Sequence, residues 1–256
     1  SALNNLTSGA GNTAIGYTTL NSCTSGGSNI AIGDTALEDL VTGGANVAIG
    51  RNAGKEMGAS ENGNILIGMA SGQSLDEGTN GTIDSNIAIG KDSFLGGNLN
   101  TASTVVKGNI AIGTDTMNST GTNASLGQIA IGHEALTALT SGSANLAIGY
   151  QSLDACTTGL QNVAVGETAL SGTVDGVGNT AIGLSCMAVG DAGNYNTGVG
   201  NQVLVDVTGS NNVAMGFQSL FDLTSGSNNV AMGHQTLKTA NGVESQNIAI
   251  GSYTML

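Results

Sequence analysis

A short motif, Asn-x-Ala-Ile-Gly, recurs with small variations along the whole chain of 256 residues. Fourteen glycines close the motif, and seven of the thirteen intervals between them are 17 residues long. Self-similarity at a fixed short period is typical of a repeat protein whose units stack on their neighbours. We therefore expect one solenoid domain over residues 1–256. The glycines are Gly16, Gly33, Gly50, Gly68, Gly90, Gly113, Gly132, Gly149, Gly166, Gly183, Gly200, Gly216, Gly233 and Gly251.

Each repeat carries two apolar clusters, which are described here by counting from the glycine as position 0. In the repeat that follows Gly33, positions 4 and 7 are Leu37 and Leu40, and positions 14 and 16 are Val47 and Ile49. Seventeen residues are too few for the helical pair of an all-α repeat. The period therefore predicts an all-β fold, a β-solenoid (parallel β-roll) with 17-residue coils, in which each coil contains one short strand that ends at the glycine.

The glycine and the asparagine of the motif have clear structural interpretations. Glycine at position 0 indicates a backbone angle that a β-carbon would forbid, at the corner where the strand ends. Asparagine at position 13 fits a corner ladder, in which each amide bonds to turn backbone and to the equivalent amide one coil away. Gln128 replaces it once. The ladder residues are Asn12, Asn29, Asn46, Asn64, Asn86, Asn109, Asn145, Asn162, Asn179, Asn196, Asn212, Asn229 and Asn247.

Position 15 is restricted almost entirely to alanine, with Leu66 and Gly198 as the exceptions. Positions 14 and 16 share one face of an extended segment, and position 15 points to the other. We expect the isoleucines and valines to point inward, and the alanines to pack closely against other copies of the chain. These alanines are Ala14, Ala31, Ala48, Ala88, Ala111, Ala130, Ala147, Ala164, Ala181, Ala214, Ala231 and Ala249.

Longer coils interrupt the array at residues 51–131, where the intervals stretch to between 18 and 23 residues. Insertions in a solenoid emerge as loops on one side. Loops at 57–62, 74–84 and 96–107 are therefore the least repetitive surface, either for recognition or as tolerated insertions. Both ends of the chain fall within a coil, and solenoids need caps, so we expect the 256 residues to be part of a longer protein.

Composition excludes several classes of function. Five basic against eighteen acidic residues, a net charge of -13, disfavour nucleic acid as a partner. No apolar run is long enough to insert into a membrane. Cys23, Cys156 and Cys186 lie too far apart along the stack to form disulfides, so they are expected to be free thiols.

No motif for catalysis or for metal or cofactor binding is present. The two histidines, His133 and His234, lie six coils apart and cannot share a site within one chain. There is no HExxH, CxxC or P-loop sequence, and acidic residues lack the fixed repeat position that periodic calcium binding requires. We expect no enzyme activity, no cofactor, no metal site and no catalytic residues.

The repeats Asn29-Ile30-Ala31-Ile32-Gly33 and Asn109-Ile110-Ala111-Ile112-Gly113 resemble those of the left-handed β-roll heads of trimeric autotransporter adhesins. The fuller unit from Gly226 to Leu237 is more similar to the repeats of bacteriophage tail fibres. The resemblance implies a homotrimeric structural fibre or adhesin segment on a virion tail or an extracellular cell surface. It also implies attachment to a host through a surface glycan or protein receptor. The 17-residue period and the leucine at position 4 favour the phage fibre.

Three alternatives remain at this stage. A bacterial trimeric surface adhesin or an extracellular filament protein would show the same repeats. An ice-binding solenoid is suggested by threonines at positions 8 and 9, namely Thr24, Thr140, Thr157, Thr208 and Thr224. A polysaccharide depolymerase on a β-solenoid would need acids that converge in a groove, for which the sequence offers no candidate.

Overall fold

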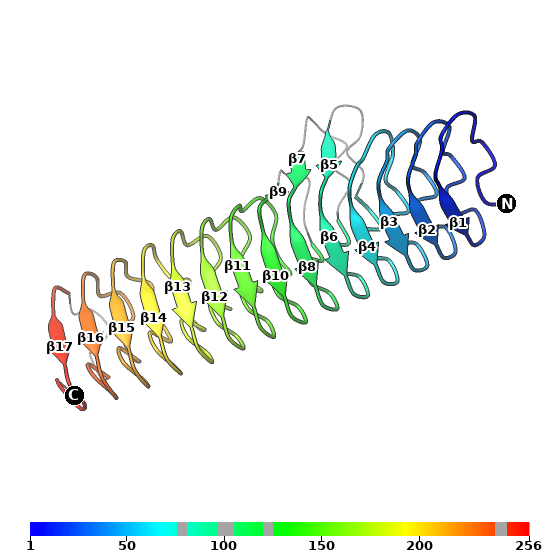
Figure 1. Cartoon of the computed structure of the whole chain (residues 1–256). Helices are drawn as coiled ribbons and strands as arrows, with labels where there is room; N and C mark the ends of the chain where they lie inside the picture. Colours follow the sequence, from blue (N-terminus) through cyan, green and yellow to red (C-terminus); the bar gives the residue numbers. More distant parts are fainter. Residues whose placement is uncertain (76–80, 97–104, 120–124, 239–244, 256) are drawn as a thin grey trace. The chain divides into compact units, whose positions relative to one another are not determined.

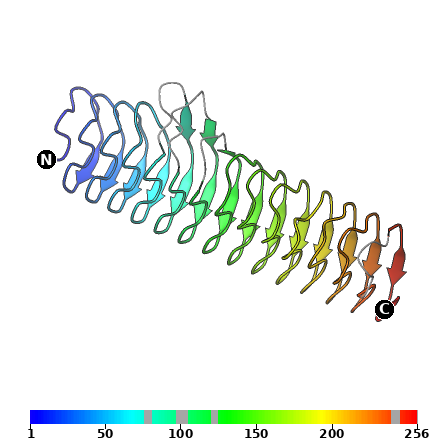
Figure 2. The same ribbon diagram turned by 180° about the vertical axis from the view of Figure 1, so that it is seen from behind.

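The computed structural model describes residues 1–75, 81–96, 105–119, 125–238 and 245–255. It comprises two compact units, Ser1–Ile131 and Gly132–Leu256, each of which is a stack of coils (Figures 1 and 2). All regular elements among these residues are β-strands, which confirms the predicted all-β class. A search of the same residues for an apolar helix of membrane-spanning length finds none.

In the first unit one short strand per coil builds a parallel sheet, in which every strand pairs with the strand one coil away. The strands are β1 (Thr13–Ile15), β2 (Ile30–Ile32), β3 (Val47–Ile49), β4 (Ile65–Ile67), β6 (Ile87–Ile89), β8 (Ile110–Ile112) and β10 (Ile129–Ile131). Three further strands, which belong to the longer coils, form a separate parallel side sheet. They are β5 (Thr82–Asp84), β7 (Val105–Lys107) and β9 (Ser125–Leu126).

The second unit repeats this arrangement without a side sheet among its described residues. Equivalent positions of the motif again lie beside each other, as in the pairing of Ala147 with Ala164. The strands are β11 (Leu146–Ile148), β12 (Val163–Val165), β13 (Thr180–Ile182), β14 (Thr197–Val199), β15 (Val213–Met215), β16 (Val230–Met232) and β17 (Ile248–Ile250). The β-solenoid with coils of about 17 residues is thus confirmed.

The glycine after each strand marks a corner that excludes a side chain. Gly33 has φ of +137°, and a Cβ added there would lie 2.3 Å from the carbonyl oxygen of Gly50 in the next coil. Both the positive φ and the close backbone approach favour glycine. Glycine at the corner therefore allows consecutive coils to approach closely.

The two faces of each strand are reversed relative to the sequence-based prediction. Eleven of the twelve alanines at position 15 are at most 2% exposed within a single chain, and Ala14 in the first strand is half-buried. They pack inside the coil with the leucines of positions 4 and 7, such as Leu37 and Leu40, which are fully buried. The assignment of Ala14, Ala31, Ala48, Ala88, Ala111, Ala130, Ala147, Ala164, Ala181, Ala214, Ala231 and Ala249 to packing between chains is therefore wrong, because a partner cannot reach side chains that the coil itself encloses.

The exceptions at position 15 show why alanine is the rule there. Leu66 is fully buried, and position 4 is glycine both in its own coil, at Gly54, and in the next, at Gly72. A Cβ added at Gly54 would lie 2.7 Å from Leu66 Cδ1, and one added at Gly72 would lie 2.8 Å from Leu66 Cδ2. One leucine at position 15 thus fills the space that leucine at position 4 fills in other coils. The interior is narrow, so side-chain volumes compensate each other across it.

The asparagines of position 13 form a continuous hydrogen-bonded ladder in each unit. Asn46 donates from its backbone N and from Nδ2 to Asn29 Oδ1, at 3.0 and 3.1 Å. Nδ2 of Asn29 also donates to the carbonyl oxygen of Gly43, at 3.0 Å. The same pattern links Asn145, Asn162 and Gly176 in the second unit. The ladder satisfies buried backbone groups that would otherwise be costly.

The three cysteines are free and buried. Burial raises the pKa of all three thiols, to about 11 for Cys156 and about 12 for Cys186. They fill interior positions and are protonated at neutral pH.

Candidate interaction surface

The isoleucines and valines of positions 14 and 16 point out of the coil and form what we call the outer face of each sheet. Ile30, Ile49 and Met215 are 39%, 36% and 41% exposed, whereas the alanine between each pair is buried. The outer face of the first unit consists of Thr13, Ile15, Ile30, Ile32, Val47, Ile49, Ile65, Ile67, Ile87, Ile89, Ile110, Ile112, Ile129 and Ile131. That of the second consists of Leu146, Ile148, Val163, Val165, Thr180, Ile182, Thr197, Val199, Val213, Met215, Val230, Met232, Ile248 and Ile250.

Within each unit the outer face is continuous, because the strands pair in register. Ile30 lies beside Val47 and Ile32 beside Ile49, and the pairing repeats from coil to coil at the ~4.8 Å spacing of strands. The face carries no charged residue, and its only polar members are Thr13, Thr180 and Thr197. Apolar patches of this extent are rare on monomeric soluble proteins and mark interaction sites. The outer face is the strongest candidate site on the molecule.

A ridge at position 1 borders the outer face and carries most of the exposed rings. In the second unit His133 stacks on Tyr150 with ring centroids 5.6 Å apart, and Phe217 stacks on His234 at 5.3 Å. Tyr253, at position 2 of the last coil, meets His234 edge-on at 5.0 Å. These contacts cover part of the ring faces of the second unit, whereas Tyr17 in the first unit is 71% exposed.

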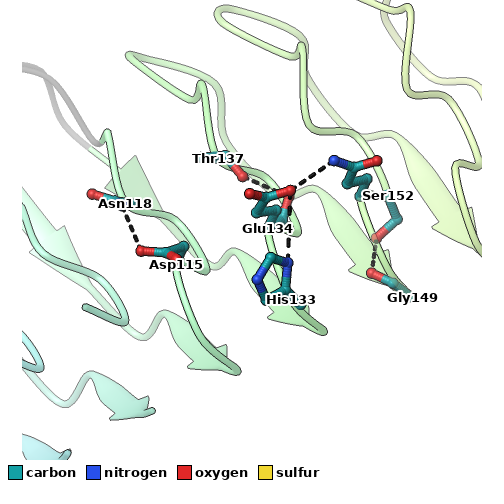
Figure 3. A network of polar contacts seen from close by, with 8 residues as sticks. Asp115, Asn118, His133, Glu134, Thr137, Gly149 and Ser152 are labelled. Carbon is teal, nitrogen blue, oxygen red and sulfur yellow. Dashed lines mark hydrogen bonds and ion pairs between the residues drawn. The ribbon is translucent and has the colours of Figure 1, made fainter. Parts of the chain in front are cut away.

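Polar contacts around His133 form a network on the surface of the second unit (Figure 3). His133 Nδ1 lies 3.6 Å from Glu134 Oε2, and Gln151 Nε2 donates to the same oxygen at 2.6 Å. Thr137 donates its hydroxyl to the carbonyl oxygen of Glu134. No hydroxyl or thiol nucleophile is hydrogen-bonded to the imidazole among these contacts. Across the residues that the structure describes, no three His, Cys, Asp or Glu side chains gather in a way that could hold a metal ion.

The threonines at positions 8 and 9 point their hydroxyls at backbone. Thr140 Oγ1 donates to the carbonyl oxygen of Thr157, at 2.9 Å, and Thr208 Oγ1 donates to that of Thr224, at 3.0 Å. The hydroxyl protons are thus used within the coil stack. The hydroxyl oxygens keep lone pairs that can accept from water, but these hydroxyls do not donate to it.

The longer coils place part of the predicted loops in the side sheet. Strand β5 covers the end of the 74–84 loop and β7 the end of the 96–107 loop, whereas residues 76–80 and 97–104 lie outside the described ranges. Of the described loop residues, Met57, Glu61, Leu75, Ile83 and Val106 are buried. Comparisons with protein-family models, with curated proteins and with solved structures find no match. The surface is therefore interpreted from its own residues.

The outer face was missed by the sequence analysis, although a signal for it exists. Position 4 is glycine both in the coil of Leu66 and in the next coil. Where position 15 is Gly198, position 3 carries the larger side chains of Cys186 and Val203. Such compensation between position 15 and positions 3 and 4 indicates that they face each other across the interior. Positions 14 and 16 must then face outward.

Proposed function

We propose that this chain is a segment of a self-associating fibre or adhesin, of the kind found in bacteriophage tail fibres, which attaches to a host cell surface. The observation that supports the proposal is the apolar outer face, a surface that needs a cover along its whole length in each unit. A second copy of the chain is the cover that fits best, because its own outer face has the same coil spacing and the same lack of charge. The resemblance to trimeric adhesins and fibres makes three copies the expected number.

The acidic chain with its ladder-stabilised coils suits a structural role outside the cell or on a virion tail. Nucleic acid is disfavoured as a partner by the net charge of -13. The ice-binding alternative is weakened by the threonine hydroxyls that donate to backbone carbonyls. A depolymerase would need a pair of carboxylates that converge in a groove, for which the sequence offers no candidate motif. We therefore propose a non-enzymatic role without a cofactor.

Attachment is tested by incubating fluorescently labelled protein with a panel of bacterial strains and with cultured animal cells. Saturable binding to a subset of bacterial strains would support the phage-fibre proposal. Binding to animal cells alone would favour the bacterial adhesin instead. Absence of binding to every cell type, by protein that is folded and assembled, would contradict a role in attachment.

A further inference from the structure

Glu61 is the only buried acidic residue in the part of the chain that the structure describes. Its place in the coil follows from the ladder, whose amides donate to the carbonyl oxygens of Gly43, Glu61, Ile83 and Val106 in successive coils. Ile83 and Val106 are at most 2% exposed, and the Glu61 side chain, at 1%, points into the coil as they do. A carboxyl group therefore takes the place of an apolar side chain.

The interior offers this carboxyl group a single hydrogen bond. Glu61 Oε1 accepts from the backbone N of Gly58, at 2.7 Å. Glu61 Oε2 is buried and has no hydrogen-bond partner. Removal of an ionised carboxylate from water without a compensating charge costs far more than burial of the neutral acid. The surroundings of Glu61 therefore favour its protonated form.

The charges around Glu61 do not offset this preference. No ion pair among the described residues includes Glu61. On segments 38–46, 55–62, 69–75 and 82–84, which pack together around it, the other charged residues are Glu38, Asp39, Lys55, Glu56 and Asp84. Four of these five are acidic, and a negative field also favours the neutral form of a carboxyl group. Asp84 lies on the face of β5 opposite Ile83, so its carboxylate is outside the interior.

The backbone beside Glu61 connects the coil stack to the side sheet. Asn46 Nδ2 donates to the Glu61 carbonyl oxygen, at 2.8 Å. The next residue, Asn62, pairs with Asp84 of β5, and its backbone N donates to Asp84 Oδ1 at 2.8 Å. The hydrogen bond from Gly58 to the carboxyl group closes the 58–61 segment just before this connection. A charge on Glu61 would therefore act at the place where β5 joins the stack.

We propose that Glu61 is a pH-sensitive switch, whose neutral carboxyl group keeps the 58–62 segment closed against the coil. Ionisation releases the proton to water and draws the carboxylate out of the interior, so that Gly58 N loses its acceptor and the segment opens. The stability that the neutral form provides is complete below the ordinary titration range of glutamate, about pH 4.3. It is lost as the pH rises through the range in which the buried group ionises. This inference does not depend on the proposed function.

Nuclear magnetic resonance of the full chain, labelled at the glutamate Cδ, tests the protonation state directly. The chain has seven glutamates, and an ordinary glutamate is ionised at about pH 6. We expect one Cδ signal to keep its neutral position at that pH and to titrate at higher pH. The signal should be absent in Glu61→Gln and present in Glu56→Gln, which removes the same charge outside the buried column.

Thermal unfolding of the same three proteins tests the link to stability. We expect the Tm of Glu61→Gln relative to the wild type to rise by about 3–6 °C between pH 5 and pH 8, because it has no buried group to ionise. Glu56→Gln should keep a constant difference from the wild type. Seven glutamate signals that are all ionised at pH 6 would overturn the proposal, and so would a Glu61→Gln difference that does not change with pH. The titration of the wild type decides if Glu61→Gln does not fold.

Discussion

At the scale of single residues, glycine at the corner of each coil is fixed by backbone angle and by space together. Gly90 has φ of +141°, and an added Cβ would lie 2.2 Å from the carbonyl oxygen of Gly113. Gly108 also has a positive φ, +69°, but an added Cβ would meet no atom within 4 Å. The two positions differ in the space around an added Cβ and in backbone region, because φ near +140° is open essentially to glycine alone, whereas many other residues of this chain adopt φ near +60°.

Alanine at these two glycines should therefore have unequal effects. We expect Gly90→Ala to lower the free energy of unfolding by more than about 3 kcal/mol, because φ and contact are both violated. Gly108→Ala should lose only about 1 kcal/mol, the cost of left-handed backbone for a residue with a Cβ. Urea unfolding measures both. Equal losses would show that neither the φ of the corner nor its close approach makes Gly90 harder to replace than Gly108.

The buried thiols predict a dependence on pH. Burial raises the pKa of Cys186 to about 12 from the ordinary 9.0. Folding therefore favours the protonated thiol, so the stability linked to Cys186 is complete below pH 9.0 and falls as the pH rises toward about 12. At pH 8 we expect no reaction of the native protein with a thiol reagent such as DTNB, and reaction of all three cysteines in guanidinium chloride. Rapid labelling of the native chain would contradict the buried placement.

At the level of the strand, the residue at position 15 is determined by the side chains that it meets across the interior of the coil. Leu66 fills the space left by Gly54 and Gly72, so the interior of a coil behaves as one volume shared by positions 4 and 15. Leu66→Ala should lose about 2–5 kcal/mol because it leaves a cavity. Gly54→Leu should also destabilise, because its Cβ would lie 2.7 Å from Leu66 Cδ1.

The double variant Leu66→Ala/Gly54→Leu restores the ordinary combination in that coil. We expect it to lose less stability than the two single variants together, by about 1–3 kcal/mol of coupling. A double-mutant cycle measured by urea unfolding tests this expectation. Additive effects would mean that the two positions do not share the interior.

The sequence predicted the period, the corner glycine and the parallel strands, because each depends on a residue type with one physical use. It could not assign the faces from alternation alone. Alternation shows that Val47 and Ile49 share a face, and both faces of a strand in a narrow coil can be apolar. Hydrophobicity alone therefore assigned the isoleucines and valines to the wrong face, because the interior beside Leu37 and Leu40 has room only for alanine. Side-chain volume was the better guide. The side sheet depends on insertions without a repeat, so no pattern predicted it.

Across the whole molecule, we propose that other copies of the chain cover the outer face. Val165 lies on that face in β12 and is half-buried, whereas Val174 is 40% exposed on the turn that follows the interior Leu170 of the next coil. A lysine at either position makes the same chemical change. Only the lysine at Val165 would place a charge in the proposed interface, where burial of an unpaired charge is strongly unfavourable.

Sedimentation equilibrium of the wild type, Val165→Lys and Val174→Lys at matched concentrations tests this claim most directly. We expect the wild type and Val174→Lys to sediment at three times the 25.1 kDa mass of the chain and Val165→Lys to dissociate toward the single chain. Circular dichroism should show the same strand content for all three proteins. A wild type that remains a single chain over the whole concentration range, or a Val165→Lys variant that assembles as the wild type does, would contradict the account.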